Sequence, residues 1–240
     1  MSASAITLLD VVNKIMIRLR DQAVTSITST IESTGGTPAY TDTVVRLIND
    51  ARREVEDCFN WTALQQTITL TTVSGTKLYN LENTTAEVYS NQRTRVLDVY
   101  NTTTDARLIS RPFDWVRKQS QISSSTNQEP FAYAVAGYNA SQTIQLQLFE
   151  TPDAIYSIDV ECIIPQEDLT ANTDYFKVPW YPVYLRSLAL AIRERGEDEG
   201  EQSSEVEAAY RQAIGNAIAY EQQHKWQGQG GGDWIVLGDY

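Results

Sequence analysis

The stretch that decides the fold runs from Leu47 to Leu81 and reads LINDARREVEDCFNWTALQQTITLTTVSGTKLYNL. Before and within its first half, apolar residues recur every three or four positions, which predicts a helix that buries one face. These residues are Val44, Ile48, Ala51, Val55 and Phe59. From Gln66 the period becomes two, because Ile68 and Leu70 alternate with threonines. The sequence therefore predicts a helix that ends near Trp61 and a β-strand directly after it.

A second strand is expected after a short turn. Ser74-Gly75-Thr76 is a turn-forming sequence, and the run Leu78-Tyr79-Asn80-Leu81 follows it. Two short strand patterns around such a turn are typical of a β-hairpin. No catalytic motif lies in this stretch.

The order of helix, aromatic corner, threonine-rich hairpin and Tyr-x-Leu resembles the head-to-tail adaptor (connector) proteins of tailed bacteriophages. The residues that carry the resemblance are Leu47–Val55, Trp61 and Gly75–Leu81. The resemblance implies a dodecameric homo-oligomer ring between the portal protein and a tail tube or nozzle protein, with C-terminal extensions running along portal subunits. The long connection from Asp21 to Tyr40 departs from the family's plan.

The N-terminal region predicts a helix before that connection. Leu8, Val12, Ile15 and Leu19 fall on one helical stripe, and Thr7 or Ser4 can cap the helix. The connection is rich in Ser, Thr and Gly and contains Gly35-Gly36-Thr37-Pro38; Thr41 or Asp42 is expected to cap the next helix.

Strand patterns dominate from Leu64 to Pro165. They cover 93–101, 107–110, 131–137, 143–149 and 155–164, and a short helix is expected after Pro112 to cover one end of the sheet. Residues 143–148 alternate almost without exception, which predicts a sheet with one solvent-exposed face.

Helical patterns return after Pro165. One helix is expected to begin at Pro182, and an acidic turn from Gly196 to Gly200 separates it from a last helix over about 201–225. Val206, Tyr210, Ala213, Ala217 and Tyr220 are expected to share one face of that last helix.

These patterns predict an α+β fold in which the N- and C-terminal helices form one bundle around an inserted antiparallel β domain. The expected boundaries are 1–62 plus 178–226 for the helical bundle, 63–177 for the insert and 227–240 for an extended C-terminal tail.

Composition narrows the classes of function. The formal net charge of −12 argues against tight nucleic-acid binding, because phosphate neutralisation needs clustered Lys and Arg. The mean hydropathy of −0.35 is ordinary for a globular protein. No apolar run in the sequence is long enough to span a membrane, and Met1–Ala5 lacks the pattern of a secretory signal. Cys58 and Cys162 are isolated and are expected to be buried, reduced thiols.

Common catalytic and metal-binding patterns are missing from the sequence. The single histidine, His224, lies near the end of the last expected helix, where it can act as a helix-end cation, and two distant cysteines cannot complete a zinc site. The glycines from Gly228 to Gly232 lack the strand, helix and lysine of a phosphate loop, and they are interpreted as a tether. We expect no cofactor and no metal.

Acidic residues crowd the turn between the last two helices. They are Glu194, Glu197, Asp198, Glu199 and Glu201, followed by Glu205 and Glu207. Such a run is usually a solvated turn; the functional interpretation is a negative rim or channel lining that lets DNA pass without specific binding.

The tail combines the glycine tether with an apolar peptide. Its candidate portal- or neighbour-binding residues are Trp226, Trp234, Ile235, Val236, Leu237 and Tyr240. Exposed apolar clusters are avoided by monomers, so docking on a partner is expected, although folding back on the same chain is the alternative.

The sequence thus predicts a non-enzymatic adaptor at the head-tail junction of the virion, assembled in the host cytoplasm. Two alternatives stay open at this point: a virion-associated carboxylate-based peptidoglycan hydrolase, and a carbohydrate-binding β module using Trp115, Tyr133 and Tyr138 if these prove exposed together.

Overall fold

The computed structural model describes residues 6–27, 40–83, 88–122, 127–196 and 201–229, and for residue 122 and residues 224–229 it describes the backbone. The chain divides into two compact units. The first is helical and combines Met1–Ala63 with Gln166–Tyr240, and the second is the β unit Leu64–Pro165. The expected α+β class is confirmed.

The helical unit begins with α1 (Leu8–Arg18) and α2 (Tyr40–Cys58). Thr7 caps α1 in a capping box with Asp10, as one of the two expected caps. The buried stripes, Leu8, Val12 and Ile15 on α1 and Val44, Ile48, Ala51 and Val55 on α2, are those of the sequence pattern. Because α2 begins at Tyr40, Thr41 and Asp42 lie within its first turn rather than before it.

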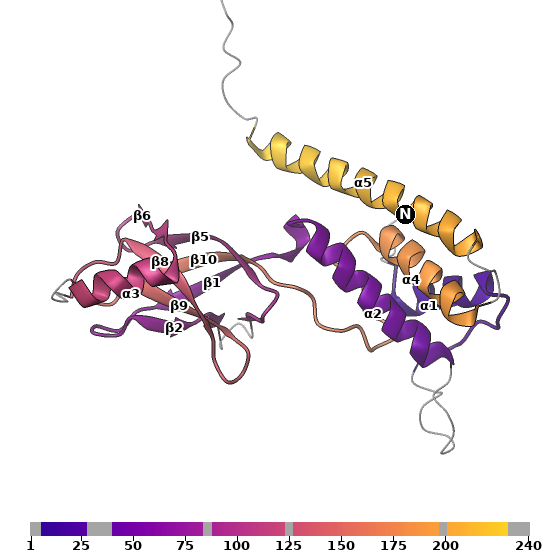
Figure 1. Ribbon diagram of the computed structural model, residues 1–240, viewed down its shortest axis with the longest axis horizontal. Coiled ribbons are helices and arrows are strands. Elements are labelled where there is room, and N and C mark those ends of the chain that lie inside the picture. Colours follow the sequence, from indigo (N-terminus) through magenta and orange to yellow (C-terminus); the bar gives the residue numbers. More distant parts are fainter. Residues whose placement is uncertain (1–5, 28–39, 84–87, 123–126, 197–200, 230–240) are drawn as a thin grey trace, which may run out of the picture. The chain divides into compact units, whose positions relative to one another are not determined.

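Two further helices complete this unit, α4 (Trp180–Arg195) and α5 (Glu201–Gln229). Helix α4 packs against both α2 and α5, and it also contacts α1 (Figure 1). Gly196 ends α4 in the left-handed conformation, with φ of 65°, which glycine adopts without steric cost. None of the described helices is long and apolar enough to cross a lipid bilayer.

The β unit contains two four-stranded sheets and one short pair of strands. One sheet has the order β1 (Gln65–Thr71), β10 (Ser157–Ile163), β5 (Arg95–Asn101) and β6 (Ala106–Arg107). The other has the order β2 (Leu78–Asn80), β9 (Ile144–Phe149), β8 (Ala132–Tyr138) and β7 (Ile109–Ser110). Strands β3 (Glu82–Asn83) and β4 (Val88–Tyr89) form the pair, α3 spans Phe113–Ile122, and a 3-10 turn, η2, spans Thr62–Leu64.

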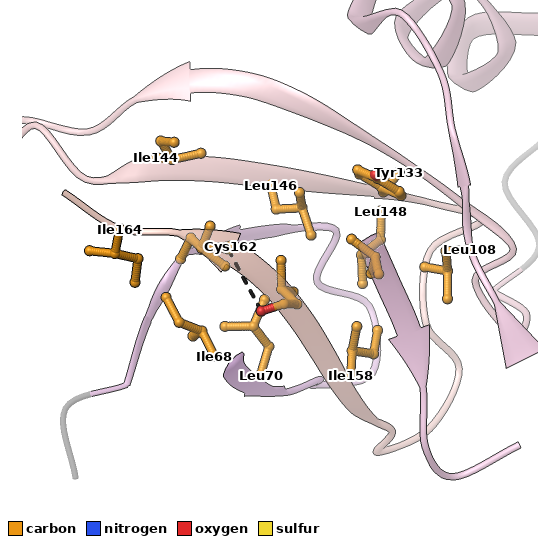
Figure 2. Close-up of a cluster of buried hydrophobic side chains, with 13 residues drawn as sticks. Ile68, Leu70, Leu108, Tyr133, Ile144, Leu146, Leu148, Ile158, Cys162 and Ile164 are labelled. Atoms are coloured by element: carbon orange, nitrogen blue, oxygen red, sulfur yellow. Dashed lines mark hydrogen bonds between the residues drawn. The ribbon is translucent and has the colours of Figure 1, made fainter. Parts of the chain in front are cut away.

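The core of the β unit lies between its two large sheets. Figure 2 shows Leu146 and Leu148 of β9 on one side and Leu70 and Ile158 of β1 and β10 on the other. All four are buried. Alternation along each strand directs every second side chain into this shared layer, which is the usual way a sandwich forms its core.

The expected hairpin between the first two strands is wrong. Strand β1 pairs with β10, antiparallel from Gln65 opposite Ile163 to Thr71 opposite Ser157, whereas β2 pairs with β9. The Ser74-Gly75-Thr76 segment therefore carries the chain from one sheet to the other. Gly75 has a φ of 80°, as its turn chemistry indicated, but a turn sequence does not say which strands it joins.

Two other expectations for the sheets need correction. Ile109–Ser110 pairs in parallel with β8, so the insert is not purely antiparallel. The outer face of β9 is also not open to solvent along its whole length, because α3 packs on β8 and β9 and places Val116 against Ala132, Ala134 and Phe149. Gln147, expected on the solvent face, is 8% exposed.

Residues 166–177, which the sequence pattern assigned to the insert, belong with the helices. Asn49 of α2 accepts a hydrogen bond from the Leu169 backbone N–H at 2.9 Å and donates one to the Leu169 carbonyl at 3.0 Å. Farther along, the Leu8 N–H donates to the Asp174 carbonyl at 2.7 Å. These contacts place the segment on α2 and α1 although it has no regular secondary structure.

Candidate interaction sites

Helix α5 is the most exposed regular element of the helical unit. It is 29 residues long, and among residues 201–223, whose exposure the structure describes, only Ser203 is buried. Val206, Tyr210, Ala213 and Ala217 are half-buried on the side that packs against the unit. Ala208, Ala209, Gln212, Gly215 and Ala219 are exposed. A helix of this length with one partially covered face has surface available for another protein.

Tyr220 does not share the face with Val206 and Tyr210. Its side chain is 66% exposed, and the half-buried position one residue later is Glu221, which accepts a hydrogen bond from the Thr62 N–H at 2.7 Å. Thr62 directly follows Trp61, which is 2% exposed and donates its ring N–H to the Val55 carbonyl at 2.8 Å. The aromatic corner thus holds the chain where it leaves α2.

Arginines of α4 and α5 lie beside the carboxylates that flank the turn between these two helices. Glu194 and Glu201 are exposed, and Glu197, Asp198 and Glu199 lie outside the described residues. Glu207, by contrast, pairs with Arg211 at 3.2 Å, with Arg193, and with Arg186 at 3.9 Å. Hydrogen bonding from Arg211 and the charges of Arg193 and Arg186 lower the pKa of Glu207.

Arg195 forms a second charged cluster at the same end of the unit. It pairs with Asp21, donates to the Leu19 carbonyl at 2.9 Å, and lies 4.5 Å from the centre of the Tyr40 ring. Burial raises the pKa of Tyr40 despite the nearby guanidinium. A hollow of about 410 Å³ beside this cluster is lined by Arg18, Arg20 and Glu205 among others. The acidic run predicted the carboxylates of this region but not these arginines, although Arg193 and Arg195 stand beside Glu194 in the sequence.

Most candidate residues of the tail lie outside the described part of the chain. These are Trp234, Ile235, Val236, Leu237 and Tyr240. The backbone of Trp226 is helical, because α5 continues to Gln229, beyond the expected end near Lys225. Gly228 is therefore helical rather than part of the tether; one glycine weakens a helix by about 1 kcal/mol but does not end it. The backbone of His224 is likewise helical.

The aromatic residues proposed for carbohydrate binding are not exposed together. Tyr133 is 5% exposed and belongs to the sandwich core, and Trp115 packs edge-on against Phe149 with ring centres 5.2 Å apart. Tyr138 is 50% exposed. A sugar-stacking platform needs coplanar accessible rings, so the condition for this alternative is not met.

Metal-ligating side chains do not cluster in the described residues: no group of three or more His, Cys, Asp or Glu could hold an ion there. The expectation that both thiols are buried is correct for Cys162 and wrong for Cys58, which is exposed at the end of α2 and lies 3.1 Å from the Glu54 carbonyl. Isolated cysteines are often buried, but Cys58 lies outside the apolar stripe of α2 and is open to solvent.

Comparison with known proteins identifies the family of this chain. A search of curated proteins gave no match. The family model described as "SU10 adaptor protein" matches residues 6–232, so the match spans both the helical unit and the β unit. This family is one of structural phage adaptors of the virion. With helices at both ends of the sequence enclosing a β insert and this match over most of its length, the chain belongs to the SU10 adaptor protein family of phage head-to-tail adaptors.

Proposed function

We propose that this protein assembles as a ring that docks on the phage portal, extends the DNA channel and serves as a platform for tail components. The observation that carries the proposal is α5. Folding leaves most of its described length exposed, including the side of Ala208, Ala209, Gly215 and Ala219. Small residues allow another helix to approach closely, and in a ring every copy contacts the next through the same pair of unlike surfaces, of which this side of α5 is one in our proposal.

The charge of the chain is compatible with DNA moving past it. Acidic residues outnumber basic ones by 31 to 19, so the protein repels a polyanion rather than holding it. In this proposal Glu194, Glu201 and the intervening Glu197, Asp198 and Glu199 line a rim or channel. The ion pairs of Glu207 on α5 with Arg186 and Arg193 on α4 hold the two helices on either side of that turn together.

The tail supplies an attachment point in the same proposal. Trp226 and the run Trp234–Leu237 with Tyr240 contact portal or a neighbouring subunit. Binding is the whole mechanism, and the dodecamer is the stoichiometry that the sequence resemblance implies.

Assembly with and without portal tests the proposal. The purified full-length chain is expected to stay largely monomeric in dilute solution, because like-charged copies repel at low salt. Addition of portal protein should produce a ring, detected by sedimentation velocity and by electron microscopy. A stable ring without portal contradicts the portal dependence, and no complex with portal contradicts the docking.

An α5 variant with a matched control tests whether the exposed side of α5 makes the contact between subunits. Ala219→Arg adds a long charged side chain to the exposed side of α5 and is expected to prevent ring formation without changing the melting temperature. Ser74→Arg, on an exposed turn of the β unit, adds the same charge and should assemble normally. If Ala219→Arg forms rings as well as the parent protein does, α5 does not make the contact between subunits.

A further inference from the structure

A basic aromatic groove lies at the surface of the helical unit, between the end of α1 and the start of α4. It has a volume of about 590 Å³, within the range of about 300–1,000 Å³ that is typical of ligand clefts. Its lining combines three cations, three aromatic rings and one aliphatic side chain: Lys14, Arg18, Arg20, Trp180, Tyr181, Tyr184 and Ile17. Its two sides come from distant parts of the chain, so local sequence patterns do not reveal it.

The aromatic rings of the groove pack on one another. Tyr181 and Tyr184 stack with ring centres 6.2 Å apart, and Trp180 meets Tyr181 edge-on at 5.6 Å. The Lys14 ammonium lies 5.6 Å from the centre of the Trp180 ring. Beside these rings Ile17 is 63% exposed, and Tyr181 itself is 49% exposed. The accessible part of the cluster is therefore a surface on which an aromatic or aliphatic side chain can pack.

The other side of the groove is positively charged. Among the described residues, no carboxylate forms an ion pair with Lys14, Arg18 or Arg20. Asp21 follows Arg20 in the sequence but pairs with Arg195. A chain of net charge −12 repels most acidic ligands, so cations left unpaired beside apolar surface give this groove a preference for an acidic ligand that also carries apolar side chains.

Carboxylates close to the groove do not neutralise it. Asp10 attracts Lys14, but it is held by hydrogen bonds from the Thr7 N–H at 3.0 Å and the Thr7 hydroxyl at 2.8 Å. Glu205 lines the adjoining hollow together with Arg18 and Arg20 and is exposed there. The lining of the groove itself contains cations and no carboxylate.

Arg20 occupies a backbone position at which glycine is the usual residue. Its φ is 61°, in the left-handed region that a Cβ atom makes unfavourable. The Arg20 N–H donates to the Ile17 carbonyl at 3.0 Å, and the Asp21 N–H donates to the Met16 carbonyl at 2.8 Å. These are the two hydrogen bonds of a Schellman motif, whose left-handed residue is most often glycine. Backbone geometry alone favours glycine here, so the presence of arginine is consistent with a binding role for its side chain.

We propose that the groove binds an acidic segment of the portal protein that carries an aromatic or large aliphatic side chain. That side chain packs on Ile17 and Tyr181, and the carboxylates of the segment lie beside Arg18 and Arg20. The inference rests on the proposed function, because it assigns a surface of this chain to the docking on portal.

A protein segment fits the groove better than a nucleic-acid strand does. Stacked nucleobases need open ring faces, whereas Tyr181 and Tyr184 already stack on each other and Lys14 lies over the Trp180 ring. Three cations on a chain of net charge −12 are also few for a strand with one charge per nucleotide. A short acidic segment brings fewer charges and an apolar side chain for Ile17.

Photo-cross-linking identifies the segment that occupies the groove. Full-length protein with p-benzoylphenylalanine in place of Ile17 is assembled on portal, irradiated and digested, and the linked peptides are identified by mass spectrometry. The expected partner is a portal peptide in which Asp and Glu outnumber Lys and Arg and which carries an aromatic or large aliphatic side chain. The same substitution at Ile155, which is 71% exposed on the β unit, is the matched control and should not link to that peptide.

Arg20→Gly separates binding from folding. The urea midpoint of the full-length variant is expected to stay the same or rise, because glycine adopts the left-handed conformation without steric cost. Its affinity for immobilised portal should fall about tenfold, as the loss of a charge-assisted contact implies. Lys77→Ala removes one positive charge at an exposed position of the β unit and should leave the affinity unchanged. Equal affinities of the parent protein and Arg20→Gly contradict the proposed role of this cation.

A short model peptide tests the chemistry of the groove without portal. Fluorescent EDWLED is titrated into the full-length protein at constant salt, together with QNWLQN, which lacks carboxylates, and EDSSED, which lacks apolar side chains. EDWLED should bind about tenfold more tightly than either of the others. Ile17→Gln should weaken this binding, whereas Ile155→Gln should not. Equal affinities of the three peptides contradict the proposed selectivity, and tighter binding of a fluorescent oligothymidine would assign the groove to nucleic acid instead.

Failure of this inference can be distinguished from failure of the proposed function. Rings on portal in which position 17 links to this chain itself, to a basic portal peptide or to nothing would overturn the groove assignment and leave portal docking intact. If the parent protein forms no complex with portal at all, the proposed function is contradicted and portal is not the occupant. The titration with EDWLED still measures the selectivity of the groove in that case.

Discussion

At the scale of single residues, the most buried charge in the described helical unit is Arg52. Its side chain is 0% exposed, and its guanidinium donates to Glu56 at 2.6 Å, to the Gln166 carbonyl at 2.6 Å and to Asp168 at 3.0 Å. Its Nε has no hydrogen-bond partner in the described structure. Because Glu56 is 1% exposed, the pair is a buried ion pair that ties α2 to the segment returning from the β unit.

Loss of this guanidinium should be costly. Arg52→Met leaves the Glu56 carboxylate buried without its cation, and the expected decrease in the free energy of unfolding is about 3–5 kcal/mol, measured by urea denaturation. Arg53→Ala is the matched control, since Arg53 pairs with the same Asp168 but its side chain is 46% exposed. For Arg53→Ala, the free energy of unfolding is expected to decrease by about 0–1 kcal/mol. Similar values for the two variants would contradict a special role for burial.

The two cysteines should differ in reactivity. Burial raises the pKa of the Cys162 thiol to about 12, and the side chain lies in the sandwich core (Figure 2). Since the thiolate is the reactive form, a folded protein near pH 8 should incorporate one maleimide per chain, at the exposed Cys58, and a second only in denaturant. Mass spectrometry counts the labels. Rapid labelling of Cys162 in the native protein would show that the sandwich opens.

At the scale of elements, the capping box of α1 makes helix stability depend on pH. Thr7 and Asp10 exchange hydrogen bonds, with the Thr7 N–H donating to Asp10 at 3.0 Å and the Asp10 N–H donating to the Thr7 hydroxyl at 3.3 Å. Hydrogen bonds from Thr7 lower the pKa of Asp10 below its ordinary value of 3.8. A carboxylate whose pKa is lowered by folding stabilises the folded state above its unfolded pKa, and this contribution is lost as the pH falls through the folded value.

Removal of the cap should therefore have an effect that depends on pH. Thr7→Ala is expected to lower the free energy of unfolding by about 1 kcal/mol at pH 7, and by less at a second pH below 3.8, because the contribution of the Asp10 carboxylate declines as the pH falls toward its lowered pKa. Denaturant titrations at the two pH values measure the difference. Thr76→Ala, at an exposed position beside a turn of the β unit, controls for the loss of a hydroxyl. An equal cost of Thr7→Ala at both pH values would argue against the contribution of the Asp10 carboxylate.

At the scale of the whole molecule, net charge governs the encounter with DNA. The full-length protein should show no binding to duplex DNA at physiological salt in a fluorescence anisotropy titration, because no long basic stripe is present to release counterions. Three cations line one groove at the surface of the helical unit, namely Lys14, Arg18 and Arg20, and they are too few to hold a duplex at that salt. Submicromolar affinity that weakens steeply with added salt would reveal a basic surface. It would contradict the proposal that DNA moves past this protein without binding to it.

Helices and the alternation of strands could be predicted from the sequence because both depend on neighbouring residues. The stripe of Val44, Ile48, Ala51 and Val55 repeats within a few turns, and the Thr7 cap is three residues from its partner Asp10. The nested order of helices and insert also follows from the sequence of local patterns. The family could be inferred at the same stage, since it depends on the order of these elements.

Only the tertiary structure decided which distant segments meet. The pairing of β1 with β10 depends on residues about 90 positions apart, and a turn at Gly75 fits a hairpin as well as a crossing between sheets. How the elements pack also decides that Cys58 is exposed and that Arg186 and Arg193 surround Glu207. Local sequence sets which face of an element is apolar; the partner that covers that face is chosen by the packing of the whole unit.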